Sequence, residues 1–576
     1  MSAVVKDTDL PDVEPLSIGA LPLLNRFIER LRLQETIAKH VPADKREKIE
    51  PALTLLVLLR NLLISRRPLY EIPDWAASFD PGLLGLPLEA DKYLNDDRLG
   101  RSLDKLFRAD FMTLITEVVT IAVDEYDLDL SQIHNDATAQ RFIGQYPDAD
   151  GSPAYGHETH CITYGHPKKD GRPDLKQLLY ILTTTADGGV PIWVNIDHGN
   201  TADVSTHIRT WKAVRKITGT SNFLYVADCK LCSDENLAFI DQNKGRFLTV
   251  LPANWIEHRQ FHELIREQDV AWEDVVIKKS KRRKDDPPIV YRGYEPAEGM
   301  HQGYRILWFW SSQKEADDRA ARDRSLQRAQ NELQEIRKRI GQPYSRLTTR
   351  EKIMDAAQKV LRERKVDKWL KIEVVTTQTQ DKRKTGPGRP GPQSTYVMET
   401  KVNHTLQWQI DALELQKEAR SDGIFPLITN DKKTSMLEAL EAYKYQPMIE
   451  KRFEQLKTVF NLRPVLLQNH LRIEALFILY FLVLLVETLI ERETRKLMKK
   501  RGIKELPIYA EGKDSRAPTA RCLFDLFEKV QRFKLVNAHG QVVGNRYGKL
   551  TESQLKVLDL HGISEKDYLT AADRVS

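Results

Sequence analysis

The chain has 576 residues, and at roughly 150 residues per domain this length predicts about three or four folding units. Hydrophobic residues make up 41% of the sequence and charged residues 30%, a composition that excludes disorder as the dominant state. The 88 Lys and Arg residues exceed the 82 Asp and Glu residues by 6, which permits a polyanionic partner without requiring one. Only 4 Cys residues are present, so a disulfide scaffold is excluded and a reducing cytosol is indicated.

The first segment, residues 1–125, is predicted to form a helical domain. Apolar residues recur at three- and four-residue spacing in IGALPLLNRFIERL and in PALTLLVLLRNLLI. Asn95 precedes a further amphipathic pattern, where it is expected to cap a helix. We expect this domain to dock on DNA or to form a dimer contact. A compact helical domain without either role is the alternative, and the sequence does not separate the two.

Residues 126–260 change to short β-prone runs. A strand ends in HNDATA, and two further strands are joined at Asp187-Gly188-Gly189, a hairpin signal. The strand FLYVAD, a short helix and the strand FLTVLP follow. A hairpin followed by strand–helix–strand predicts a mixed sheet covered by helices, so the expected fold class is mixed α+β.

The remaining sequence is divided into three segments. Residues 261–420 are predicted to be a large insertion with strands and charged helices, residues 421–492 to resume the core, and residues 493–576 to form a C-terminal tail region. Within the second of these, residues 475–486 (ALFILYFLVLLV) are strongly apolar, but a helix needs about 20 residues to cross a bilayer. We therefore expect a buried helix and no membrane association. The acidic start of the chain shows no secretory signal, so a cytoplasmic location is expected.

Three acidic residues are candidates for a shared site. Asp136 in HNDATA and Asp228 in FLYVAD are each expected to end a strand, and Glu450 lies in the predicted helix IEKRFEQLK. A single carboxylate at a strand end is ordinarily a surface or capping group. Three of them at one sheet edge, however, can hold two Mg²⁺ ions roughly 3.5–4 Å apart, an arrangement that clamps a phosphoryl group.

The sequence around Glu450 resembles the Tyr-Arg-Glu-Lys signature of bacterial insertion-sequence transposases, which carry a DDE triad on an RNase H-like fold. That signature places two residues between Tyr and Arg, three between Arg and Glu, and six between Glu and Lys; Tyr443, Glu450 and Lys457 match it. Gln446 stands at the Arg position. The blocks HNDATA and YVADCKLCSDENLA also resemble the family, and the resemblance covers about residues 20–490.

The resemblance implies an RNase H-like core with an insertion before the Glu-bearing helix. It implies that Asp136, Asp228 and Glu450 bind two Mg²⁺ ions, for which Mn²⁺ substitutes, and catalyse DNA cleavage and strand transfer. Tyr443 and Lys457 are then contacts to transposon-end phosphates, whereas Gln446 lacks the charged fork of Arg and weakens that contact. The implied partners are double-stranded DNA, both transposon ends and target, and a second copy of the chain in a homodimer, in a bacterial cytoplasm in association with the nucleoid.

Two alternatives keep the same fold: a metal-dependent endonuclease that does not join ends, and a catalytically inactive DNA-binding relative that acts as a repressor. Glu454, one turn after Glu450, is a rival ligand with the wrong spacing to Lys457. Pro447 fits the first position of a helix, so the helix that carries Glu450 is expected to start there. His134, two residues before Asp136, is interpreted as a polar strand-end residue rather than a contact to metal or DNA.

Two basic segments are predicted to contact DNA. Six of the seven residues in KKSKRRK (278–284) are basic, and Lys281, Arg282 and Arg283 are assigned to phosphate contacts, with a solvated surface as the alternative. Arg389 lies in KTGPGRPGP, which resembles an AT-hook core and is suited to a narrow minor groove. A flexible loop between two strands is the alternative for Arg389.

Overall fold

The structure is a computed structural model. It describes residues 11–87, 90–165, 173–279, 286–296, 300–387, 389, 391–392, 394–460, 467–509, 513–539 and 541–571. The chain divides into two compact units. The split unit comprises Met1–Thr249 and Leu440–Ser576, and the inserted unit comprises Val250–Ala439. The inserted unit lies where the sequence places an insertion, with wider bounds than residues 261–420, and the finer division of the chain into five segments stays a prediction.

The N-terminal part of the split unit is helical, as expected. Its α-helices are α1 (Leu21–Arg30), α2 (Leu33–His40), α3 (Pro51–Ile64), α4 (Ile72–Ala77), α5 (Asp96–Arg108) and α6 (Phe111–Tyr126). Asn95 caps α5, because its side chain accepts a hydrogen bond from the Arg98 backbone N–H. Every residue of α3 from Pro51 to Leu63 is buried, so the dense apolar run serves as the core of its own unit.

The central sheet of the split unit has the predicted mixed topology. It contains β2 (Gln132–Phe142), β3 (Lys176–Thr185), β4 (Pro191–His198), β5 (Leu224–Ala227) and β6 (Arg246–Val250), in the order β4-β3-β2-β5-β6. β2, β3 and β4 are antiparallel neighbours, whereas β2 pairs with β5, and β5 with β6, in parallel. Gly188 and Gly189 form the β3–β4 turn with φ of 82° and 66°, a conformation that favours glycine. The helices α7 (His207–Thr218) and α8 (Asp234–Gln242) connect the later strands.

The C-terminal part returns to the same unit. It contributes α13 (Met436–Lys444), which begins in the inserted unit, and then α14 (Pro447–Phe460), α15 (His470–Lys500), α16 (Ala520–Phe527), α17 (Glu552–Leu560) and α18 (Glu565–Leu569). A second sheet pairs β1 (Asp12–Ser17) with β14 (Gln531–Val536), which also pairs with β15 (Val542–Tyr547). Among the described helices, α15 alone is long and apolar enough to cross a membrane, and its apolar stretch is fully buried inside the protein, as predicted for residues 475–486.

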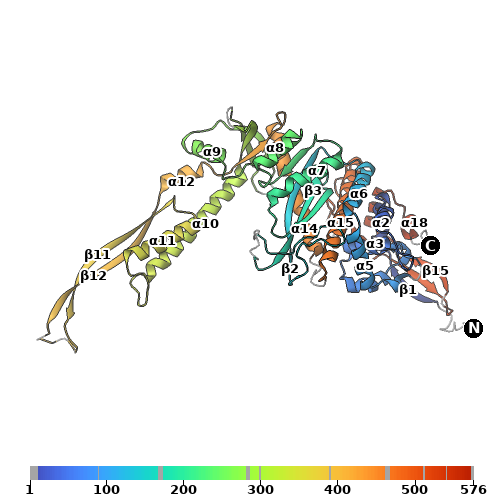
Figure 1. Ribbon diagram of the computed structural model, residues 1–576, viewed down its shortest axis with the longest axis horizontal. Coiled ribbons are helices and arrows are strands. Elements are labelled where there is room, and N and C mark those ends of the chain that lie inside the picture. Colours follow the sequence, from blue (N-terminus) through green and yellow to red (C-terminus); the bar gives the residue numbers. More distant parts are fainter. Residues whose placement is uncertain are drawn as a thin grey trace, which may run out of the picture. The chain divides into compact units, whose positions relative to one another are not determined.

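The inserted unit combines an antiparallel sheet with an extended ribbon. The sheet runs β13 (Ile424–Thr429), β10 (Tyr304–Ser311), β8 (Ile289–Tyr294) and β7 (Glu273–Lys278), and β9 (Met300–His301) pairs with β10. Its helices are α9 (Ile256–Glu267), α10 (Ser312–Arg339), α11 (Arg350–Arg364) and α12 (Ala412–Ala419). β11 (Leu370–Lys384) and β12 (Tyr396–Ile410) form the ribbon, whose base packs on α10 and α11 around Leu333, Ala357 and Leu406 (Figure 1).

Candidate active site

Asp136 and Asp228 lie on neighbouring parallel strands. The β2–β5 register pairs His134 with Val226 and Asn135 with Ala227, so the two aspartates come next on their strands at the same level. The expectation that both aspartates end a strand is correct only for Asp228. β2 continues past Asp136 because it stays paired with β3, where Asp136 faces Leu182. Asp136 therefore lies where β2 passes the end of β5.

Local hydrogen bonds orient both aspartates. Asp136 Oδ1 accepts a hydrogen bond from the Ala137 backbone N–H at 2.8 Å, and Asp228 Oδ1 accepts one from the Lys230 backbone N–H at 2.9 Å. The backbone carbonyl of Asp228 also accepts a hydrogen bond from Thr249 Oγ1 at 2.6 Å, which ties the end of β5 to β6. Both side chains are half-buried, so each keeps access to solvent while its orientation is restrained.

Glu450 lies in the first turn of α14, which starts at Pro447 as predicted. α14 contacts β2 and β3 (Figure 1). Tyr443 is in the last turn of α13, and burial raises the pKa of its hydroxyl, with further contributions from the Cys229 thiol and from the Asp228 and Glu450 carboxylates. Tyr443 is therefore within electrostatic range of two of the three predicted catalytic residues.

The donor set of this site suits a hard divalent cation, since three carboxylates offer only oxygen ligands. Among the described residues, no three His, Cys, Asp or Glu side chains are close enough together to hold one ion as they stand. Carboxylates that no cation neutralises repel one another, which favours a wider spacing than a loaded site has. The carboxylates of Asp136, Asp228 and Glu450 suit Mg²⁺ by their chemistry, but the described residues do not include a closed site for it.

Gln446 is held inside the fold. Its Oε1 lies 2.9 Å from His134 Nδ1, and its Nε2 donates to the Asn135 backbone carbonyl at 3.3 Å. His134 is 1% exposed and its ring lies 5.1 Å from that of Tyr445. Burial lowers the pKa of His134 to about 4, against the opposing effect of the Gln446 hydrogen bond, so the imidazole is neutral at pH 7. His134 is therefore a buried partner of Gln446, not a polar residue at an open strand end.

Arg452 holds the other side of α14, and the sequence reasoning missed it. Its guanidinium donates to the carbonyls of Gly188 and Gly189 at 2.7 and 3.1 Å and pairs with Glu491 of α15 at 2.9 Å. Both charged side chains of this pair are 3% exposed. The one available signal was the Gly188-Gly189 turn, which presents carbonyl groups without side chains to shield them.

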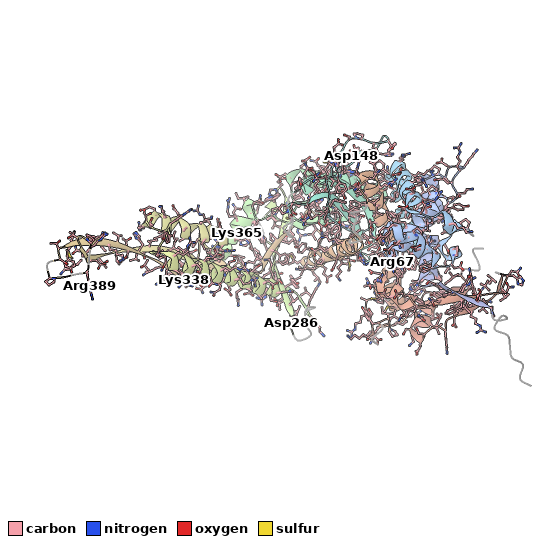
Figure 2. All side chains as sticks on the ribbon, turned by 90° about the horizontal axis from the view of Figure 1, so that it is seen from below. Arg67, Asp148, Asp286, Lys338, Lys365 and Arg389 are labelled. Carbon is pink, nitrogen blue, oxygen red and sulfur yellow. The ribbon has the colours of Figure 1, made fainter. Side chains whose placement is uncertain are left out.

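The remaining predicted site residues lie on the exposed face of α14, on the ribbon and outside the described residues. Lys457 and Glu454 are exposed on α14, and Lys457 lies about two turns from Glu450. Arg389 is exposed in the loop at the end of the ribbon of the inserted unit (Figure 2). Lys281, Arg282 and Arg283 lie outside the described residues.

Comparison with known families identifies the class of protein. The model described as "Transposase DDE domain" matches residues 148–486, more than half of the chain. The chain belongs to this transposase family. The matched range contains Asp228 and Glu450, whereas Asp136 precedes it. The helical N-terminal segment, residues 13–120, matches a domain of unknown function (DUF4277).

Other comparisons are more distant. One similar solved structure is a cryo-EM structure of a piggyBac transposase synaptic complex with hairpin DNA, at 12% sequence identity and a TM-score of 0.26. The similarity covers 50% of this chain and 61% of that chain. No curated protein matches the chain.

Proposed function

We propose that this transposase binds the ends of an insertion sequence, cleaves DNA there in a metal-dependent reaction, and joins the freed ends to target DNA. The observation that supports this most strongly is the adjacency of Asp136 and Asp228 on parallel strands, with the Glu450 helix packed on one of them. The membership of the chain in a DDE transposase family adds to it. The triad assignment itself is part of the proposal.

Asp136, Asp228 and Glu450 would hold two Mg²⁺ ions, or Mn²⁺ in their place, through carboxylate oxygens. When bound, such cations supply charge neutralisation at the phosphate and activation of the attacking oxygen. The half-buried aspartates would hold the cations at β2 and β5, while exposed Glu450 would complete the site from α14. Water is the nucleophile for cleavage, and the freed 3′ hydroxyl then replaces it for joining, so no covalent bond to the protein is needed.

The predicted DNA contacts form the second part of the proposal. Lys457 is exposed two turns along the helix from Glu450, where its ammonium group can reach a phosphate beside the site. Tyr443 lies beside the acidic residues. The remaining candidates are Lys281, Arg282 and Arg283 in the basic run and Arg389 at the end of the ribbon, whereas Gln446 at the signature position is bonded to His134 and Asn135 instead. The bacterial, nucleoid-associated location and the homodimer, in which each protomer holds one DNA end, belong to the same proposal.

A strand-transfer assay tests the proposal against its two rivals. Full-length protein is incubated with DNA from the flanks of its gene, both intact and pre-cleaved, and a supercoiled plasmid, in Mg²⁺ or in EDTA. The proposal predicts Mg²⁺-dependent cleavage and joined products. Cleavage without joining would identify an endonuclease, and DNA binding without either product would identify an inactive repressor.

A further inference from the structure

A chain of hydrogen bonds joins α14 to β2 beside the acidic residues. Gln132 Nε2 lies 2.8 Å from His134 Nε2, His134 Nδ1 lies 2.9 Å from Gln446 Oε1, and Gln446 Nε2 donates to the Asn135 carbonyl at 3.3 Å. An amide nitrogen only donates, so His134 Nε2 accepts from Gln132. The imidazole proton is then on Nδ1 and points at Gln446 Oε1. Each hydrogen-bond donor in this series therefore faces an acceptor.

This hydrogen-bond chain connects the neighbours of two predicted metal ligands. Gln446 directly precedes α14 and stands four positions before Glu450, so the two share a face of the helix, about one turn apart. Asn135, which receives the Gln446 amide, directly precedes Asp136 on β2. The contact thus fixes the start of α14 against the strand that carries Asp136.

We propose that Gln446 and His134 are positioning residues that set the place of Glu450 relative to Asp136, and that Gln446 acts through Glu450 rather than by contact with DNA. The inference rests on the proposed function, because it assigns the two carboxylates to the divalent cations. Partners that orient metal ligands typically contribute about 10–100-fold to metal affinity or activity. A neutral amide suits this task because it both accepts from the imidazole and donates to the carbonyl, which a guanidinium cannot do.

The test measures Mn²⁺ binding and DNA binding separately on the full-length protein. Gln446→Ala and His134→Ala are expected to weaken Mn²⁺ binding by roughly 10–100-fold in calorimetric titration, and to leave the affinity for flank DNA in EDTA unchanged. His134→Asn should restore Mn²⁺ binding, because its amide N–H can take the place of the Nδ1–H. The double variant Gln446→Ala/His134→Ala should be no weaker than either single variant, since both act through one contact.

Three results would overturn the inference. The first is a loss of DNA affinity in Gln446→Ala with normal Mn²⁺ binding, which would make Gln446 a direct DNA contact. The second is failure of His134→Asn to restore Mn²⁺ binding while its melting temperature is normal. The third is an additive loss of Mn²⁺ affinity in the double variant, which would mean that the two residues act independently.

The variant Asp136→Asn distinguishes failure of the inference from failure of the proposed function. If Asp136→Asn binds Mn²⁺ and cleaves DNA like the unaltered protein, the proposed function fails. If Asp136→Asn loses Mn²⁺ binding and cleavage while Gln446→Ala keeps both, only the inference fails.

Discussion

The ion pair that holds α14 in the split unit and the ion pair on the ribbon of the inserted unit differ in burial. In the split unit, the Arg452–Glu491 pair is 3% exposed on both sides and Glu487 is 4% exposed, all beside the apolar length of α15. In the inserted unit, the ribbon pair Arg383–Glu399 is 74% and 54% exposed, and half of the residues of α10 are charged. The buried pair Arg322–Asp422 is an exception in the inserted unit.

This difference in burial indicates which part of the protein depends on a fixed arrangement of its helices. A buried ion pair carries a large desolvation penalty, so it adds little net stability, yet it holds its partners in one arrangement when every group is satisfied. Arg452 meets that condition, since its three nitrogens contact two carbonyls and a carboxylate. The buried charges of the split unit fix α14, which carries Glu450, whereas the exposed charges of the inserted unit are suited to presenting a surface.

The largest expected effect tests whether the chemistry belongs to the split unit. Asp228→Asn should lower DNA cleavage by roughly a thousandfold, because a lost metal ligand forfeits several kcal/mol of transition-state stabilisation. Binding of flank DNA in a gel-shift assay should persist. Asp381→Asn makes the same chemical change on the ribbon and should leave cleavage intact. Equal loss of binding and cleavage in Asp228→Asn would instead give Asp228 a structural role.

The next effect compares one ion pair from each unit. Arg452→Met should destabilise the protein by about 3–5 kcal/mol, because it leaves the Glu491 carboxylate buried without the Arg452 guanidinium. Arg383→Met should change stability by about 1 kcal/mol or less, because its pair is exposed to solvent. Denaturant unfolding gives the two values, and amide hydrogen exchange should show faster exchange in α14 only for Arg452→Met. Similar losses in the two variants would remove the contrast between the units.

A pH titration sharpens the comparison further. Burial, and then the charge of Glu491, raises the pKa of Glu487 to about 7, from about 4.5 in the unfolded chain. Between these two pKa values the folded state binds more protons than the unfolded state. The free energy of unfolding therefore falls by about 3 kcal/mol as the pH rises from about 4.5 to about 7. Glu487→Gln should therefore stabilise the protein at pH 8 and leave it nearly unchanged at pH 4.

The control for this titration is Glu363→Gln on α11, which makes the same chemical change at an exposed side chain. Denaturation midpoints measured across the pH range decide the question. A flat difference between Glu487→Gln and the unaltered protein would mean that Glu487 has the same pKa in the folded and unfolded states.

The smallest expected effect concerns a single phosphate contact. Lys457→Ala should reduce the slope of log affinity against log salt by about one, because one fewer counterion is released on DNA binding. Lys338→Ala on α10 also removes an exposed ammonium group and should leave the slope unchanged. Binding of flank DNA measured at four or more salt concentrations gives both slopes. An unchanged slope for Lys457→Ala would place this residue away from DNA.

Features with local causes could be predicted from the sequence. The start of α14 at Pro447, the Asn95 cap and the Gly188-Gly189 turn each depend on the backbone preferences of one or two residues. The buried helix at residues 475–486 follows from its apolar length, although α15 extends well beyond it in both directions. The mixed sheet follows from the order of the strand and helix patterns.

Features with distant causes could not be predicted. The contact between His134 and Gln446 spans 312 positions, and the pair Arg452–Glu491 joins two helices whose packing no local pattern reports. The continuation of β2 beyond Asp136 depends on its pairing with β3, not on its own residues. In the described part of residues 493–576, predicted only as a tail region, β14 pairs with β1 from the opposite end of the sequence.

The pairing of Asp12–Ser17 with Gln531–Val536 has a consequence for biosynthesis. The first strand leaves the ribosome long before its partner is translated, so this sheet cannot form until the chain has been extended through Val536. The inserted unit is contiguous in sequence and can fold during elongation. A ribosome that stops after residue 439 therefore releases a folded insertion with an unfinished core that lacks Glu450.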